Sequence, residues 1–481
     1  MGLYRHDFNK ESDKALKDEN LQKALRFTTD RFRERRKTAI AEVDNWEDLR
    51  SIAREIKKET ISRLDTYLEL LEENIVKNGG IVHWAKDADE ATKIILEIAL
   101  NGKVKSVVKS KSMATEEIEL NYALNNAGIE AIETDLGEYI IQLAGETPSH
   151  IIAPAIHKTK EDISKLFSEK LKIPYYTEPE DLTRIARDKL RQKFLMADMG
   201  VSGANFAVAE TGTIVIVENE GNARLTTTLP RIHVALMGLE KVIPRFEDLA
   251  LFLSILARSA TGQKMSSYVS LISGPKRKSE KDGPEEFHLV LLDNGRSNIL
   301  ASDETRESLY CIRCGACLNI CPVYRKVGGH SYGWVYSGPI GAIISPQLLG
   351  FDKAPDLPFA SSLCGACKDV CPLKIDIPKV LLELRNRVIE ENRKMNRVGV
   401  RTFESLGIKL WRLSMQSPRV YMALITLAYY VQKLWNRGNG HNITLLPPPF
   451  SQWAKNRDLP VFAKKPFRKR WDEIKDEQVW E

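Results

Sequence analysis

Hydrophobic positions follow a helical period over the first seventy-odd residues of the chain. Apolar side chains recur there three or four positions apart, which is the spacing of amphipathic helices. One such stretch contains Trp46, Leu49, Ile52, Ala53 and Ile56. We therefore predict a helical segment over residues 1–75, with a capping box formed by Asp44 and Glu47, and with the last helix ended by Gly79 and Gly80.

Short apolar runs replace the helical period from about residue 81 to residue 293. The runs are "IVHW" (81–84), "VKSVV" (104–108), "IEAIE" (129–133) and "HIIAP" (150–154), and amphipathic segments separate them. This alternation predicts an α/β domain over residues 76–299 with a largely parallel sheet. Within it, "FAVAETGTIVIVENEGN" (206–222) predicts a hairpin inserted in that sheet, with its turn at Thr211 and Gly212.

After residue 300 the pattern changes to short helices interrupted by Gly, Pro and Cys. It predicts a helical domain over residues 300–395, followed by a helical and linker region over 396–481, in which "NRGNGHNITLLPPPF" (436–450) is the linker. The apolar run "VYMALITLAYYV" (420–431) is shorter than the ~20 residues needed to cross a bilayer. We expect a buried or docking helix there.

Charge adds little to this picture. The chain has 481 residues and a formal net charge of +6, from 71 basic and 65 acidic side chains. This balance permits an anionic partner but does not point to nucleic acid. The basic run "RFRERRK" (31–37) suits a solvated helix face, or a docking patch for an acidic partner. The run "KKPFRKRW" (464–471) suits simple packing, or peripheral attachment to an anionic membrane or a quinone-linked partner.

All seven cysteines lie in two short stretches, so none is left for a disulfide framework. Free thiols of this kind need a reducing compartment, and the charged N-terminus has no apolar core or cleavage site of a signal peptide. We expect a cytoplasmic protein. The eight histidines are scattered without a metal-binding spacing, and we expect them to be structural.

The stretch "CIRCGACLNICP" (311–322) is a complete C-x2-C-x2-C-x3-C-P run, and "SSLCGACKDVCP" (361–372) nearly repeats it. Such a run gives three thiolates to one iron–sulfur cube and its fourth to a second cube. Zinc is the alternative, but its sites favour two separated C-x2-C pairs. We predict two 4Fe-4S clusters. The ligands of cluster 1 are then Cys311, Cys314, Cys317 and Cys371, and those of cluster 2 are Cys321, Cys364 and Cys367.

Cluster 2 lacks one thiolate, because Ser361 occupies the position that corresponds to Cys311. A serine alkoxide, a water or a carboxylate could complete the cube, or the cube could persist as 3Fe-4S. Alternatively, Ser361 is only the cap of the short helix that carries Cys364 and Cys367.

These motifs resemble those of the lactate utilization protein B family of bacterial iron–sulfur proteins, over nearly the whole chain. The segments that carry the resemblance are "CIRCGACLNICP", "YSGPIGAIISP" (336–346), "LPFASSLCGACKDVCPLKIDIP" (357–378) and "GANFAVAETGTIVIVENEGNARLTTTLPRIHV" (203–234). The resemblance implies an α/β lactate-utilization domain, similar in fold to CoA transferases and sugar-phosphate isomerases, before a helical two-cluster ferredoxin domain. It also implies an electron carrier that works beside two other subunits in oxidising L-lactate to pyruvate. The serine at 361 agrees with the family pattern.

The sequence contains no G-x-G-x-x-G after a strand and no other flavin or nicotinamide fingerprint. The step that removes a hydride from lactate therefore has no evident place on this chain, whose electron acceptor is also unknown. An alternative is that the α/β domain is itself a transferase or isomerase-like catalyst, with the clusters in a redox-sensing or structural role. Its candidate residues are Glu210, Glu218, Glu220, Asn222 and Arg224.

Overall fold

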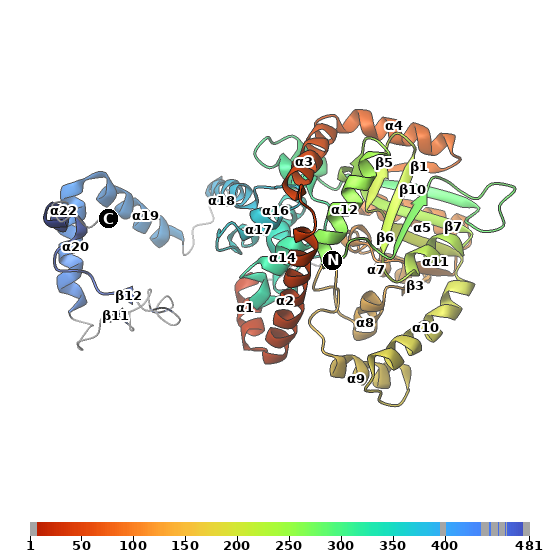
Figure 1. Ribbon diagram of the computed structural model, residues 1–481, viewed down its shortest axis with the longest axis horizontal. Coiled ribbons are helices and arrows are strands. Elements are labelled where there is room, and N and C mark those ends of the chain that lie inside the picture. Colours follow the sequence, from red (N-terminus) through yellow and green to blue (C-terminus); the bar gives the residue numbers. More distant parts are fainter. Residues whose placement is uncertain are drawn as a thin grey trace. The chain divides into compact units, whose positions relative to one another are not determined.

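The computed structural model describes residues 7–394, 401–433, 442–443, 451, 457 and 459–474. Contacts divide the chain into one unit that runs to Glu391 and a second that begins at Asn392. In the first unit, helices surround a central group of strands (Figure 1). The division into four regions at residues 75, 299 and 395 stays a prediction.

Within the described residues four helices precede the first strand, which confirms the predicted helical segment. They are α1 (Phe8–Lys17), α2 (Glu19–Ala41), α3 (Trp46–Ser62) and α4 (Leu64–Lys77). Helix α4 ends just before Gly79, whose φ of +90° favours glycine. The predicted capping box is wrong. Asn45 is the N-cap of α3 and makes no side-chain cap bond, and the Glu47 carboxylate pairs instead with Arg50 at 2.6 Å and Lys374 at 3.3 Å.

Six strands form one sheet in which every neighbouring pair is parallel. In spatial order they are β1 (Ile81–Ala85), β10 (Glu286–Leu292), β7 (Ile232–Gly238), β4 (Met199–Gly203), β2 (Ser106–Lys109) and β3 (Glu130–Glu133). All seven residues of β7 are buried, as expected for an inner strand of a parallel sheet. The sheet confirms the predicted α/β class.

Helices connect and flank these strands. They are α5 (Ala88–Asn101), α6 (Met113–Glu117), α7 (Leu120–Asn126), α8 (Leu136–Ala144), α9 (Lys160–Leu171), α10 (Pro179–Met196), α11 (Asn222–Thr228), α12 (Asp248–Thr261) and α13 (Arg296–Leu300). The strand predicted for "HIIAP" is wrong, because residues 150–154 form a loop. His150 Nδ1 accepts hydrogen bonds from the amides of Ile152 (2.9 Å) and Ala153 (3.2 Å), which closes a tight turn.

The predicted hairpin is present, but its predicted place in the parallel sheet is wrong. Strands β5 (Phe206–Val208) and β6 (Thr213–Glu218) are antiparallel and belong to a second sheet with β8 (Val242–Ile243) and β9 (Tyr268–Ile272). The parallel sheet has no gap for the hairpin, because β4 pairs directly with β7. At the hairpin turn Gly212 has a φ of +61°, and a Cβ there would lie 2.5 Å from the backbone of Asn74.

Short helices follow the last strand of the parallel sheet. They are η2 (Arg306–Tyr310), α14 (Ala316–Ile320), α15 (Tyr324–Val327), η3 (His330–Tyr332), α16 (Gly338–Leu349), η4 (Leu357–Phe359), α17 (Ala366–Val370) and the longer α18 (Ile377–Lys394). One hydrophobic core contains side chains of this region, such as Leu318, and of the hairpin, such as Val208. The α/β part and the cysteine-bearing part of the first unit therefore share a core.

The second unit contains α19 (Arg401–Gln416), α20 (Pro418–Gln432), β11 (Asn442–Ile443), β12 (Leu459–Pro460) and α22 (Phe467–Ile474). Helix α20 matches the run predicted as a helix, but it is not buried, since Leu427 is 57% and Tyr430 58% exposed. Within the described residues no helix is long and apolar enough to span a membrane. Most of the predicted linker, 436–450, lies outside the described residues.

Candidate functional site

The first cysteine motif folds as a loop followed by one short helix. Cys311 follows η2, and Cys321 is the C-cap of α14. Gly315 is the N-cap of α14 and has a φ of +73°, a conformation that glycine adopts without a steric penalty. A Cβ at this position would also lie 3.1 Å from the side chain of Ile152. The loop geometry thus explains why glycine stands between the second and third cysteines.

The second motif is built in the same way. Gly365, with a φ of +85°, is the N-cap of α17, and Cys371 is its C-cap. Helices α14 and α17 pack against each other, which brings the two motifs together. Cys367 and Cys371 are buried, whereas Cys364 is exposed.

Ser361 occupies the same local structure as Cys311. Its Oγ accepts a hydrogen bond from the amide of Leu363 at 3.1 Å, and the Sγ of Cys311 accepts one from the amide of Arg313 at 3.4 Å. The alternative that Ser361 only caps the following helix is wrong, since Gly365 is that cap and no side-chain cap bond forms. The hydroxyl instead stabilises the turn before the helix.

Cys314 and Cys367 each have an electrostatic neighbour in the other motif as well as one in their own. Burial, and then the nearness of Cys311 and Cys371, raise the pKa of Cys314 to about 12. Burial, and then Cys321 and Cys364, raise the pKa of Cys367 to about 12. Cys371 thus lies near first-motif thiols, and Cys321 lies near second-motif thiols.

Burial keeps these thiols protonated unless a metal binds them. Burial and the nearness of Cys311 raise the pKa of Cys371 to about 11, so it would stay protonated without a metal. A metal ion deprotonates a coordinating thiol outright. Among the described residues, no three His, Cys, Asp or Glu side chains surround a single ion position. The ligands of an iron–sulfur cube are spread more widely, because each thiolate binds a different iron atom.

Arginines from the N-terminal helices contact the second motif, and the sequence interpretation missed them. Arg50 donates from Nη2 to the carbonyls of Cys371 (2.7 Å) and Asp369 (2.8 Å). Arg36, within the basic run predicted as a solvated face, donates to the carbonyl of Val370 at 2.9 Å. The expectation is therefore wrong for Arg36. The sequence contains one signal of this contact: Arg50 and Arg54 are four positions apart, so they lie on the same face of α3.

Arg54 extends this contact along the chain. Its Nη1 donates to the carbonyls of Leu373 (3.1 Å) and Lys374 (2.6 Å), and its Nη2 pairs with Glu307 at 3.1 Å. Helix α3 therefore fixes the backbone that follows Cys371.

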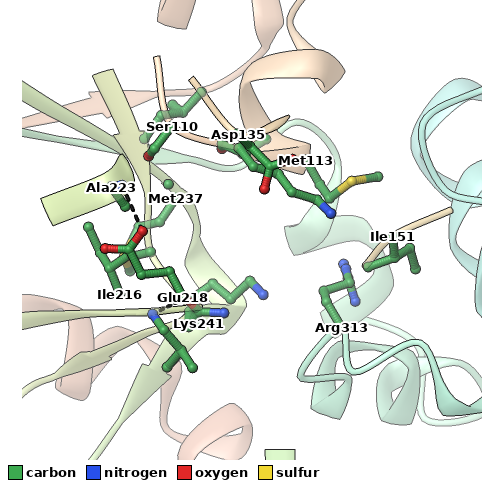
Figure 2. A pocket seen from close by; sticks show the side chains of 18 of the residues that line it. Ser110, Met113, Asp135, Ile151, Ile216, Glu218, Ala223, Met237, Lys241 and Arg313 are labelled. Atoms are coloured by element: carbon green, nitrogen blue, oxygen red, sulfur yellow. Dashed lines mark hydrogen bonds between the residues drawn. The ribbon is translucent and has the colours of Figure 1, made fainter. Parts of the chain in front are cut away.

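A pocket of about 270 Å³ lies where the α/β part meets the first cysteine motif. Its lining comes from the ends of three neighbouring strands: Ser110 follows β2, Ala204 follows β4, and Gly238 ends β7. Figure 2 shows Lys241 and Arg313 reaching toward the same open space from opposite sides. Arg313 belongs to the cysteine loop, so the pocket adjoins the predicted cluster 1.

Three of the five residues proposed for catalysis line this pocket: Glu218, Glu220 and Asn222. The carboxylate of Glu218 accepts the amides of Ala223 and Arg224, both at 2.8 Å. The other two residues do not join them. The Arg224 side chain is exposed outside the lining, and Glu210 accepts the amide of Phe246 at 2.8 Å elsewhere on the hairpin.

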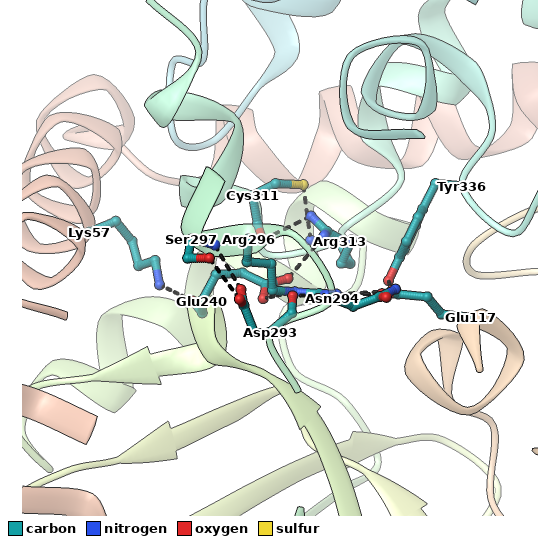
Figure 3. A network of polar contacts seen from close by, with 10 residues as sticks. All are labelled: Lys57, Glu117, Glu240, Asp293, Asn294, Arg296, Ser297, Cys311, Arg313 and Tyr336. Atoms are coloured by element: carbon teal, nitrogen blue, oxygen red, sulfur yellow. Dashed lines mark hydrogen bonds and ion pairs between the residues drawn. The ribbon is translucent and has the colours of Figure 1, made fainter. Parts of the chain in front are cut away.

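A buried ionic network connects the pocket to the cysteine loop (Figure 3). Arg296 pairs with both oxygens of Glu117, at 2.8 and 2.9 Å, and with Glu240 at 2.6 Å. Glu240 also pairs with Arg313 at 3.0 Å. These cations hold the pKa of Glu240 at about 2 despite its burial. Arg313 is thus held in place by a charge from the α/β domain.

Two further groups complete the network. Tyr336 donates its hydroxyl to Glu117 at 2.7 Å, and its ring lies 4.8 Å from the guanidinium of Arg313. Lys57 is buried and donates to the carbonyls of Glu240 at 2.5 Å and Val242 at 3.1 Å. Neither was identified from the sequence, because their partners are distant along the chain.

Three families match consecutive parts of the chain. They are the LUD domain over residues 68–292, the 4Fe-4S dicluster domain over 307–375, and the C-terminal part of Lactate utilisation protein B over 383–476. A duf162 family protein from Deinococcus radiodurans, of solved structure, is 13% identical and covers 48% of this chain and 98% of its own, with a TM-score of 0.28.

Curated relatives of similar length are named Lactate utilization protein B. The one from Bacillus licheniformis is 45% identical over 479 residues, which are 99% of each chain. The one from Bacillus subtilis is 45% identical and covers 96% of this chain and 95% of its own. The one from Geobacillus kaustophilus is 45% identical over 97% of each chain.

Proposed function

Because the chain belongs to the lactate utilization protein B family, we propose that it is an electron-carrying subunit in the oxidation of L-lactate to pyruvate. The relatives' name supports the lactate part of the proposal. The match to the dicluster domain supports the electron-carrying part. The observation that carries it is the packing of α14 against α17, which puts two cysteine motifs side by side.

The proposal includes a crossed set of ligands. Cluster 1 takes Cys311, Cys314, Cys317 and Cys371, and cluster 2 takes Cys321, Cys364 and Cys367. The thiol neighbours support this assignment, since Cys371 raises the pKa of Cys314, and Cys321 raises that of Cys367, after burial in each case. The open coordination position of cluster 2 is then the one at Ser361, because its hydroxyl occupies the place in the second motif that the Cys311 sulfur occupies in the first.

The two bound clusters would supply neighbouring one-electron carriers. The chain's own residues would hold the clusters in position and balance their negative charge. Arg36 and Arg50 place positive charge beside the second motif while they bond its carbonyls. Arg313 holds the first motif, through its amide to the Cys311 sulfur and its guanidinium to Glu240.

The proposal places hydride removal from lactate on another subunit, because this sequence has no flavin or nicotinamide fingerprint. Two other lactate-utilization subunits are the expected partners, in the cytoplasm. Two electrons leave each lactate, and the two carriers would pass them on singly to an acceptor. The rival function is catalysis by the α/β domain, whose proposed likeness to CoA transferases and isomerases would make Glu218 or Glu220 the reactive group.

Anaerobic mixing of the cluster-loaded chain with its two partner subunits and L-lactate tests the proposal. We expect a cluster EPR signal to develop only when all three proteins and lactate are present. The isolated, cluster-loaded chain should not reduce artificial dyes with lactate. Dye reduction by this chain alone would contradict the carrier function, and unchanged clusters in the complete mixture would contradict it as well.

A further inference from the structure

The pocket beside cluster 1 lies at the place where open parallel sheets usually bind ligands. From β2 the chain moves outward to β3, and it then returns to β4 on the opposite side of β2 before continuing to β7. The connections that follow β2 and β4 therefore diverge, and a crevice forms outside the carboxyl ends of these strands. Ser110 and Ala204, one after each strand, both line the pocket.

Two cationic side chains, Lys241 and Arg313, face the space of the pocket. The Nζ of Lys241 has no hydrogen-bond or ion-pair partner among the described residues, although the side chain lies beside the buried network. Burial and the positive charge of Arg313 lower the pKa of Lys241 to about 8, so an anion placed between these two cations would be favoured. Lys111, also in the lining, is engaged with the carbonyl of Ile152 at 2.6 Å.

The lining also contains a carboxyl group, that of Glu220, which can bond a neutral polar group. Glu220 accepts the amide of Leu136 with one oxygen, at 3.0 Å, and its other oxygen has no partner within the part of the chain that the structure describes. Partial desolvation, and then the charge of Asp135, raise the pKa of Glu220 to about 7. At neutral pH it can therefore accept a hydrogen bond from a hydroxyl or donate one to a carbonyl.

We propose that this pocket binds a small hydroxy or keto acid, with its carboxylate between Lys241 and Arg313 and its hydroxyl or carbonyl toward Glu220. The volume of about 270 Å³ is slightly below the ~300–1,000 Å³ of drug-sized ligand sites, which suits a molecule of few atoms. The choice of L-lactate and pyruvate as ligands rests on the proposed function, in which another subunit removes the hydride, so this pocket would bind the acid without oxidising it. The site itself rests on the geometry.

Calorimetric titration of the anaerobic, cluster-loaded chain, without partner subunits, tests this site. We expect saturable binding of L-lactate or pyruvate, and weaker binding of acetate and inorganic phosphate. Lys241→Met should reduce the affinity by roughly tenfold or more, because it removes a charged hydrogen-bond donor. Lys93→Met, at a lysine that is 74% exposed on α5, is the matched control and should bind as the unmodified chain does.

Two results of the titrations with L-lactate and pyruvate would overturn the site. One is the absence of saturable binding by either acid. The other is an affinity that stays unchanged in Lys241→Met while the cluster 1 potential shifts, which would make Lys241 only a counter-charge to that cluster. Equal binding of phosphate would also overturn it, by showing a general anion site. If Lys241→Met fails to fold, Glu220→Gln gives the same test, with an expected loss of affinity for the hydroxy acid.

A second readout needs no substitution. The pocket adjoins the Cys311 loop, so the methyl proton resonance of bound L-lactate should broaden more when the clusters are reduced and paramagnetic. Equal broadening in both states would place the ligand away from cluster 1 and contradict the proposal. Because this assay contains no partner protein, its failure leaves lactate-driven reduction in the three-protein mixture as a separate question.

Discussion

The Ser361 hydroxyl accepts the Leu363 amide at 3.1 Å, in the same local structure in which the Cys311 sulfur accepts the Arg313 amide. Leu363 and Arg313 also share a left-handed backbone, with φ values of +56° and +59°. The two turns therefore share a local conformation and differ in the side-chain atom that accepts the amide, oxygen in one and sulfur in the other.

This equivalence predicts that cluster 2 contains the labile iron. A thiolate is a softer and stronger donor to iron than a hydroxyl, which must first lose its proton. Exposure to air should convert one cluster to a 3Fe-4S form, and Ser361→Cys should slow that conversion, as followed by EPR. Ser362→Cys, at the exposed neighbouring residue, is the control and should convert at the original rate. Equal attack on both clusters would show that position 361 is not the open corner.

The crossed ligand set makes a second prediction. Cys371→Ala should perturb the same EPR signal as Cys311→Ala, although the two residues belong to different motifs, because both serve cluster 1. Cys364→Ala should perturb the other signal. If Cys371→Ala and Cys364→Ala affect one signal in common and Cys311→Ala affects the other, each motif holds its own cluster and the assignment is wrong.

Arg296 should be the most sensitive position of the buried network. Arg296→Met leaves the carboxylates of Glu117 and Glu240 buried without their main partner, and such a loss costs about 3–5 kcal/mol of stability. We expect a clearly lower thermal unfolding midpoint for the anaerobic protein. Arg184→Met is the control, since its ion pair with Asp181 is at the surface and should contribute no more than about 1 kcal/mol. Similar midpoints for both variants would show that the network contributes little.

His233 should make the stability depend on pH. It is fully buried in β7, and burial, followed by the charge of His288, lowers its pKa from 6.5 to about 3. Below pH 6.5 the unfolded chain therefore binds a proton that the folded chain does not. The contribution of neutral His233 to the free energy of unfolding is thus complete above pH 6.5, and it is lost as the pH falls toward 3. The loss approaches about 1.4 kcal/mol per pH unit.

Unfolding midpoints between pH 6.5 and 5 measure this contribution. His233→Leu should reduce the slope but not abolish it, because burial also lowers the pKa of His150 to about 3 and that of His157 to about 4. Ser202→Ala removes the hydroxyl that lies 2.8 Å from His233 Nε2 but keeps the histidine, so it should retain the slope. Identical slopes in His233→Leu and the unmodified chain would show that another group titrates.

The sequence alone determined the α/β class, the helical N-terminus and the two cysteine motifs. These features depend on local spacing: apolar runs form strands, and the C-x2-C-x2-C-x3-C pattern fixes which thiols lie in one loop. The sequence also identified Ser361 as the position at which the second motif lacks a cysteine, because a comparison of the two short segments is enough to find it. The strand at "HIIAP" and the helix-cap alternative for Ser361 failed because a side-chain atom that accepts backbone amides determines the turn, His150 Nδ1 in one case and Ser361 Oγ in the other.

Only the tertiary structure decided what surrounds the motifs. Arg50 reaches the carbonyl of Cys371 from 321 positions away, and Arg296 reaches Glu117 from 179 positions away. No periodicity connects such residues, because their meeting depends on how the helices and the sheet pack around one core. The pocket has the same origin. Lys241 follows β7 and Arg313 follows Cys311, and they face one space only because the strand order places the end of β7 beside the cysteine loop.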